Sequence, residues 1–189
     1  MVNRTTIFRS LTVAALLTLP VFGGTLGVSD LDGKAVDPFA EAARVRVLLF
    51  VRTDCPITNR YAPELQRVAQ EFNRRGVRFW LVYPDGTETV AGIRDHIAQY
   101  QFPGEPVRDP RHMLVKRAHA TVAPEAAVFD AAGNLMYHGR IDDRYVDIGK
   151  ARAAPQRHDL EDAIAAVLAG KPVAEAETSA VGCALADVE

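Results

Sequence analysis

Residues 45–58 read VRVLLFVRTDCPIT, and this stretch decides the fold around it. Its first seven residues are apolar except for Arg46, rich in valine and too few for a core helix, which predicts a strand buried on both faces of a parallel or mixed sheet. Residues 52–54 form a polar turn, and Pro56 suits the start of a helix because its missing N–H would be unpaired there. The sequence therefore predicts a strand, a turn and a helix, with Cys55 at the helix N-terminus.

The position of Cys55 at a helix N-terminus favours its ionised form, the thiolate. Free backbone N–H groups and the positive end of the helix dipole stabilise a thiolate, which lowers the thiol pKa. Thr58 lies one turn further on, where its hydroxyl can donate a hydrogen bond to the thiolate. The alternative is a buried structural thiol, because a free cysteine packs like a small apolar side chain. The polar neighbours Thr53 and Asp54 favour a nucleophilic Cys55 with Thr58 as its hydrogen-bond partner.

The rest of the chain alternates between strand and helix patterns, which is typical of an α/β domain with parallel strands. A tight-turn signal at residues 32–34 predicts an N-terminal hairpin that covers one edge of the sheet. A dense charged cluster over residues 140–144 is interpreted as an exposed loop with surface ion pairs. The expected elements are a strand over 77–83, a helix over about 88–100, a short helix over about 113–120, a hairpin turn at 130–134 followed by a strand, and a helix over 159–169.

The ends of the chain differ in composition from the middle. Arg4 and Arg9 precede an apolar run and Gly23-Gly24, so residues 1–24 are predicted to be an export signal, with an uncleaved membrane anchor as the alternative. We expect one folded domain over residues 25–170 and a flexible tail over residues 171–189. The formal net charge of −2 argues against a nucleic-acid partner. The two cysteines are too few for a disulfide scaffold.

Several motifs resemble the thioredoxin superfamily. The strand, the run Cys55-Pro56-Ile57-Thr58 and the helix resemble its active-site unit, and Pro63 matches its helix-kinking proline. Residues 121–125 resemble its cis-proline loop, with Pro124 as the proline. The resemblance is strongest to the redoxin branch, that is, the alkyl hydroperoxide reductase and thiol-specific antioxidant family together with thioredoxin-like thiol–disulfide proteins. It implies a thioredoxin-like fold with a central mixed β-sheet flanked by helices, and a cis Pro124 that faces the Cys55 sulfur.

The resemblance also implies a function: an exported, periplasmic or extracellular thiol-based oxidoreductase that uses Cys55 as nucleophile and needs no cofactor. Its partner would be a thiol or disulfide protein or a small peroxide, without stable membrane insertion after signal removal. Two departures matter. Thr58 stands where thioredoxins have a second cysteine, and Arg52 and Leu48 stand where peroxiredoxins have a threonine and a proline. Cys55 must therefore find a second sulfur elsewhere, and Cys183 in the tail is the candidate for this resolving role.

Two other functions remain open from the sequence. Thioredoxin-like copper chaperones pair cysteines with a distant histidine, so Cys55, His112 and Cys183 form an alternative metal site, since thiolates and imidazole suit Cu(I). The other alternative is a non-catalytic thioredoxin-fold binding module, in which Cys55 can be lost without consequence. Thiol–disulfide exchange and peroxide reduction both begin with the same Cys55 thiolate, and the sequence does not choose between them.

Overall fold

A five-stranded mixed β-sheet forms the centre of the computed structural model, which describes residues 27–185. The predicted export signal lies outside these residues. The strands run in the order β3-β2-β1-β5-β6; β1, β2 and β3 are parallel, and β5 and β6 are antiparallel to their neighbours. Their bounds are β1 Val45–Phe50, β2 Val77–Tyr83, β3 Glu105–Arg108, β5 Glu125–Asp130 and β6 Leu135–Gly139. The predicted mixed sheet is confirmed.

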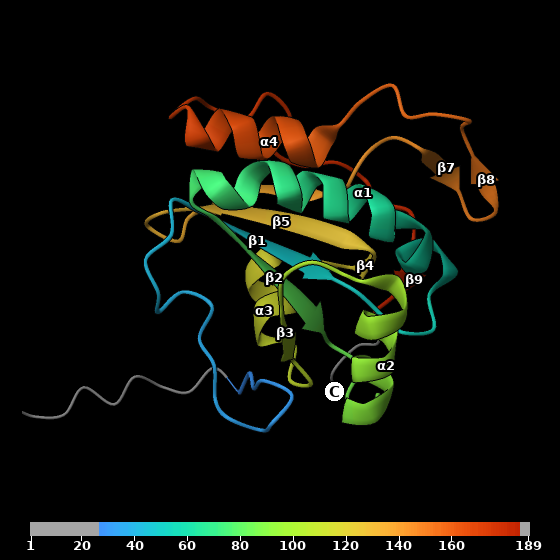
Figure 1. Cartoon of the computed structure of the whole chain (residues 1–189). Coiled ribbons are helices and arrows are strands. Elements are labelled where there is room, and N and C mark those ends of the chain that lie inside the picture. The colour runs from blue at the N-terminus through green and yellow to red at the C-terminus, as the bar shows by residue number, and fades with distance from the viewer. Residues whose placement is uncertain (1–26, 186–189) are drawn as a thin grey trace, which may run out of the picture.

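Helices cover both faces of this sheet (Figure 1). α1 (Pro56–Phe72) and α4 (Asp159–Leu168) lie on one face, with α2 (Val90–Tyr100) beside α1, and α3 (Met113–Ala118) covers the other. A short 3-10 turn, η1 (Asn73–Arg75), follows α1. α1 begins at Pro56 with Cys55 as its N-cap residue, as predicted. α2 begins two residues later than predicted because the Thr89 hydroxyl caps it, accepting a hydrogen bond from the Gly92 N–H at 3.1 Å.

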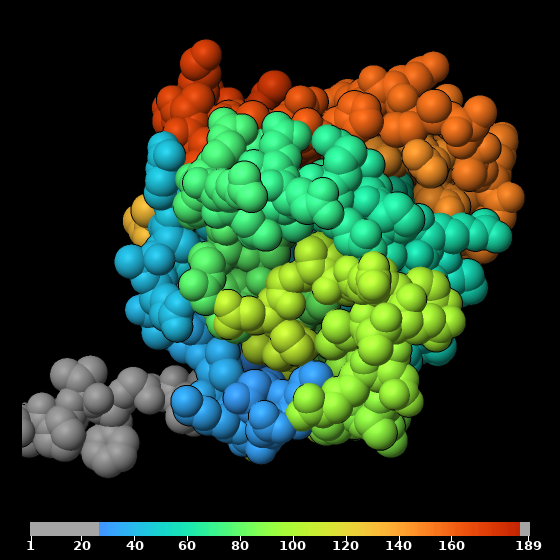
Figure 2. Space-filling model, in the orientation of Figure 1, coloured from blue at the N-terminus to red at the C-terminus, as the bar shows by residue number. Residues whose placement is uncertain are grey.

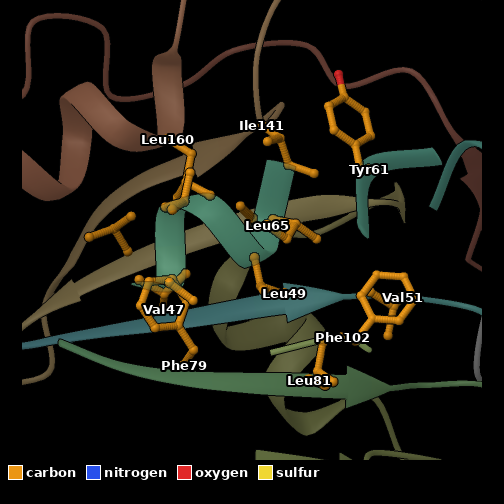
Figure 3. Packing of buried hydrophobic residues seen from close by; sticks show 14 of the residues in the cluster. Val47, Leu49, Val51, Tyr61, Leu65, Phe79, Leu81, Phe102, Ile141 and Leu160 are labelled. Atoms are coloured by element: carbon orange, nitrogen blue, oxygen red, sulfur yellow. The ribbon is translucent and has the colours of Figure 1, made fainter. Parts of the chain in front are cut away.

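The core holds β1 rigidly, since every residue of this strand is buried. On one face Val47 and Leu49 pack with Leu65 of α1 and Leu160 of α4 (Figure 3). On the opposite face Leu48 and Phe50 belong to a second cluster that includes α3. Full burial of one such side chain stabilises the fold by about 1.5–3 kcal/mol. The end of β1, where the chain turns toward Cys55, is therefore fixed from both sides of the sheet.

The N-terminal segment covers the β3 edge of the sheet, as the sequence predicts. The Ser29 N–H donates to the Arg108 carbonyl at 3.1 Å, and the Arg108 N–H donates back to Ser29 at 2.7 Å. Ser29 also pairs with Ala35 across a turn. Within residues 27–185, no helix is both long and apolar enough to cross a membrane.

The charged segment after β6 is more buried than its sequence predicts. Asp142 and Asp143 are only 1% and 7% exposed. The hydroxyl of Tyr61 donates to Asp142, and Asp143 accepts hydrogen bonds from the backbone N–H groups of Gln156 and Arg157. Asp142 therefore ties this segment to α1, and Asp143 ties it to the loop before α4, so these carboxylates do more than form surface ion pairs.

The C-terminal segment runs back over the domain, which differs from the flexible tail that the sequence predicts. It passes along β6, where the Thr178 N–H donates to the His138 carbonyl at 3.1 Å. It then forms β9 (Cys183–Ala184), which pairs antiparallel with β4 (Val122–Ala123). Gly139 permits the first approach, because a Cβ there would lie 2.2 Å from the Thr178 carbonyl oxygen. β7 (Tyr145–Asp147) and β8 (Lys150–Ala151) form a separate small hairpin.

Candidate active site

Cys55 lies at the junction of β1 and α1 and is completely buried, with 0% of its surface exposed. Its carbonyl accepts the hydrogen bond from the Asn59 N–H at 3.2 Å, so it takes part in the first turn of the helix. Its thiol donates to the Ala123 carbonyl oxygen at 3.1 Å. Ala123 directly precedes Pro124, and the peptide bond between them is cis. The predicted cis Pro124 is therefore confirmed, and its loop contacts the Cys55 sulfur through Ala123.

Thr58 supplies the environment of the Cys55 sulfur from within α1. Its side chain is buried, and its hydroxyl has no hydrogen-bond partner among residues 27–185, so this donor is free to serve a thiolate. Burial raises the pKa of Cys55, but the hydrogen bonds that the ionised sulfur accepts from the Cys183 thiol and from the N–H and hydroxyl of Thr58 outweigh burial. The net pKa of Cys55 lies below its ordinary value, in the direction expected for a nucleophilic cysteine.

Cys183 lies beside Cys55, because β9 places it opposite Ala123 in the β4–β9 pair. It is only partly buried, and both cysteines are free thiols. Burial, together with the hydrogen bond to Cys55 and the charge of Cys55, raises the pKa of Cys183 to about 11. The two sulfurs thus share a proton unequally: Cys55 ionises before Cys183, and the Cys55 thiolate accepts a hydrogen bond from the Cys183 thiol.

Arg52 and Glu88 form hydrogen bonds that fix the turn before Cys55, and Arg52 also binds the tail. Arg52 donates to the Ala184 carbonyl at 3.0 Å and pairs with Asp54 at 2.9 Å. Glu88 accepts a hydrogen bond from the Thr53 N–H at 2.6 Å. Neither of these roles of Arg52 and Glu88 is predicted from the sequence. The signal for Arg52 was its place three residues before Cys55, where a charged side chain follows a buried strand.

Gly182 allows the tail to reach the cis-proline loop. A Cβ at this position would lie 2.3 Å from the Ala123 carbonyl oxygen, which no side chain permits. Beyond Cys183, the Leu185 N–H donates to the Thr121 carbonyl at 3.0 Å. Cys55, Thr58, Pro124 and Cys183, four residues predicted from the sequence, therefore come together at one site.

His112 does not join the two cysteines. It lies just before α3, where its N–H donates to the Asp109 carbonyl at 2.9 Å. Among the residues that the structure describes, the group whose ligand atoms converge enough to hold a metal ion is Glu64, His158 and Glu161, away from the cysteines. Arg67 pairs with both carboxylates of that group. The alternative copper arrangement of Cys55, His112 and Cys183 is not assembled here.

Comparison with known proteins places this site in a family. The model of the AhpC/TSA family matches residues 18–138, which include the Cys55 turn, α1 and the cis-proline loop. The chain belongs to the AhpC/TSA family. Among curated proteins, none matches the chain. Membership of this family supports a redox function, because the matched residues include Cys55, whose pKa is lowered.

Solved structures show that this AhpC/TSA protein shares its fold with proteins of distant sequence. A hypothetical protein from Sinorhizobium meliloti 1021 is 22% identical with a TM-score of 0.70, covering 83% of this chain and 87% of its own. An uncharacterised conserved protein from Geobacillus kaustophilus is 21% identical with a TM-score of 0.71, covering 84% and 86%. A secreted Mycobacterium tuberculosis disulfide oxidoreductase homologous to Escherichia coli DsbE is 18% identical with a TM-score of 0.51, covering 77% and 97%. The thioredoxin-like fold and the redoxin branch are thus confirmed.

Proposed function

We propose that this chain is a thiol–disulfide oxidoreductase whose redox couple is Cys55 and Cys183. The observation that carries the proposal is the pairing of β9 with β4, which sets Cys183 opposite the residue whose carbonyl accepts a hydrogen bond from Cys55. The chain thereby supplies, from its tail, the second sulfur that Thr58 replaces in the helix. No cofactor takes part in this exchange.

The two sulfurs carry two electrons. In one direction a partner disulfide oxidises the pair: a Cys55–Cys183 bond forms, the partner disulfide breaks, and two partner thiols leave with the two protons. In the other direction a partner dithiol reduces the bond and is itself oxidised. The hydrogen bonds from Thr58 stabilise the Cys55 thiolate, which exists only in the reduced form, and so they make the bridge a stronger oxidant.

Two features favour this exchange over peroxide reduction. Arg52 stands where peroxiredoxins have a threonine, and its side chain holds the tail through Ala184. The tail in turn covers the Cys55 sulfur, so a peroxide meets a buried thiolate instead of an open one. The same features oppose a purely non-catalytic module, since a buried Cys55 beside a partly buried Cys183, with pKa values shifted in opposite directions, has the chemistry of a redox couple.

We also propose that the chain is exported. The support is the pattern of residues 1–24, with Arg4 and Arg9 before an apolar run, and the fact that a protein disulfide persists outside the reducing cytosol. The substrates would then be exported proteins with thiols or disulfides. Fractionation of cells that produce the full-length chain with a C-terminal tag tests this proposal, since a mature protein shortened by about the length of the signal is expected outside the inner membrane.

Turnover with a model dithiol peptide tests the redox couple. The oxidised protein is expected to convert the peptide to its disulfide, and the reduced protein to reduce the peptide disulfide. Cys55→Ser and Cys183→Ser should each abolish turnover, while Ser179→Ala, an exposed position on the same tail, should leave it unchanged. Full turnover by Cys183→Ser would contradict the couple. A faster reaction with hydrogen peroxide than with the peptide disulfide would favour peroxide reduction instead.

A further inference from the structure

The tail closes the route by which a protein partner would reach Cys55. Cys55 has no exposed surface, and Gly182 packs directly on the Ala123–Pro124 backbone beside it. The backbone of Ala123 already pairs with β9 of the same chain, so a partner chain cannot pair with it while the tail is docked. Cys183, in contrast, keeps part of its surface exposed. The sulfur that a partner can approach without unfolding the tail therefore belongs to Cys183.

Cys183 also borders a pocket. A cavity of about 250 Å³ is lined by Ile57 and Arg60 of α1, Tyr145 and Ile148 of the β7–β8 hairpin, and Cys183 itself. Ile148 is 74% exposed, the largest exposed fraction among the large hydrophobic residues described. Figure 2 shows the orange surface of this hairpin region next to the teal surface of the first turns of α1. An apolar hollow with an exposed isoleucine at its rim is typical of a surface that binds a partner.

We propose that partner thiols exchange at Cys183 and not at Cys55, and that an apolar side chain next to the partner's cysteine occupies this pocket. The proposal rests on the Cys55–Cys183 couple and adds to it the sulfur at which partners enter and the class of partner. The occupant follows from the geometry: a partner joined to Cys183 by a disulfide must place the residues that flank its cysteine against the lining of the pocket. A side chain of leucine or isoleucine size suits a lining that includes Ile57, Tyr145 and Ile148.

The chemistry is the same in both directions. A partner thiolate attacks the Cys183 sulfur of the bridge, the Cys55–Cys183 bond breaks, and its electron pair stays on Cys55 as a thiolate. Cys55 is the better leaving group because its pKa is the lower of the two. The partner's second thiolate then attacks the partner's own sulfur in the mixed disulfide, and Cys183 leaves and takes up a proton. In reverse, the Cys183 thiolate attacks the partner disulfide, the partner's S–S bond breaks and one partner thiolate leaves. The buried Cys55 thiolate then attacks the Cys183 sulfur of the mixed disulfide, the Cys55–Cys183 bond forms and the second partner thiolate leaves, so Cys55 acts as nucleophile without ever meeting the partner.

Mapping the mixed disulfide tests the entry sulfur. The oxidised wild-type protein is mixed with a peptide thiol that carries leucine beside its cysteine, quenched with acid, digested without reductant and mapped by mass. The peptide is expected on Cys183, with Cys55 free. A majority of peptide on Cys55 would overturn the proposal, and turnover would still stand because it needs only the couple.

Single-cysteine variants give a rate for each sulfur. With an activated peptide disulfide, Cys55→Ser, which keeps Cys183, is expected to react at least about tenfold faster than Cys183→Ser, even though Cys55 is the more acidic thiol. Adding Gly182→Ala to Cys183→Ser lifts the tail and should restore the reactivity of Cys55, which separates a covered thiol from an inert one. Equal rates for the two single variants, or a slow Cys55 with the tail lifted, would contradict the proposal.

The pocket has a matched control on the same hairpin. Val146 is also exposed, at 42%, but does not line the pocket. Ile148→Asp is expected to slow exchange with the leucine peptide about tenfold, the effect of losing part of one apolar contact, while Val146→Asp changes it less than about twofold. A peptide with serine in place of leucine should respond to neither substitution. An equal loss for both peptides, or for both variants, would show that the pocket does not select the partner.

Discussion

Replacing Gly182 by alanine tests whether the docked tail creates the redox couple. The added methyl group would lie 2.3 Å from the Ala123 carbonyl oxygen, where ordinary contact begins at 3.4 Å, so β9 must move away by about 1 Å. That movement lengthens two hydrogen bonds beyond their useful range: Arg52 to the Ala184 carbonyl and the Leu185 N–H to the Thr121 carbonyl, each 3.0 Å long. At about 0.5–1.5 kcal/mol each, their loss weakens docking by about 1–3 kcal/mol.

The assay is the equilibrium between the Cys55–Cys183 bridge and a dithiothreitol redox buffer, read by mass after an acid quench. Because docking sets the effective concentration of Cys183 at Cys55, the equilibrium constant for the bridge should fall about 5- to 150-fold in Gly182→Ala. Ser179→Ala, at an exposed position, is the control and should match the wild-type protein. A folded Gly182→Ala protein whose bridge is as stable as that of the wild type would refute the reasoning.

Three further perturbations follow from particular contacts. Thr58→Val removes a hydroxyl donor from the thiolate, so the pKa of Cys55 should rise, as followed by ultraviolet thiolate absorbance against pH; an unchanged titration would exclude the role of Thr58. Burial lowers the pKa of His96 from 6.5 to about 4. Between these two pH values the unfolded chain binds a proton on His96 that the folded chain does not, so the free energy of unfolding should fall by up to about 3 kcal/mol as the pH drops from 6.5 to 4. Urea unfolding at several pH values measures this loss, and His96→Gln should flatten the profile; a wild-type profile in the variant would contradict it. Thr178→Val removes the hydroxyl that hydrogen-bonds the Tyr137 hydroxyl and accepts from the Arg140 N–H, and at about 0.5–1.5 kcal/mol for each bond it should lower the free energy of unfolding in urea by about 1–3 kcal/mol; no loss would show that the docked tail does not stabilise the fold.

The fold could be predicted from the sequence where its signals are local. The apolar run that became β1 and the proline at the start of α1 place Cys55 correctly, because strand length and a missing N–H are properties of neighbouring residues. The turn signal at residues 32–34 likewise predicted the covered edge of the sheet. The charged segment at residues 140–144 was misjudged, because the burial of Asp142 and Asp143 depends on the distant Tyr61 and on the backbone near residue 157.

Only part of the candidate site could be predicted from the sequence. The cis bond before Pro124 was predicted from the resemblance to the thioredoxin superfamily, since most X–Pro bonds in folded proteins are trans. The tail was expected to be flexible because residues 171–189 lack a hydrophobic periodicity. Such a periodicity does not reveal a segment that is docked by a few local contacts, such as those of Thr178 and Gly182. The burial of Cys55 and the exposure of Cys183 follow from that docking, so the entry sulfur could not be inferred before the structure placed β9.

The most direct test of the central claim is the disulfide map of the full-length protein after oxidation by one equivalent of diamide. The reduced protein is treated at low micromolar concentration, quenched with acid, digested without reductant and analysed by mass. A monomer in which the Cys55 peptide is joined to the Cys183 peptide is the result that this account predicts, with Gly182→Ala giving less of it than Ser179→Ala. Recovery of Cys55 as a sulfinic acid or in an intermolecular disulfide, with Cys183 free throughout, would contradict it.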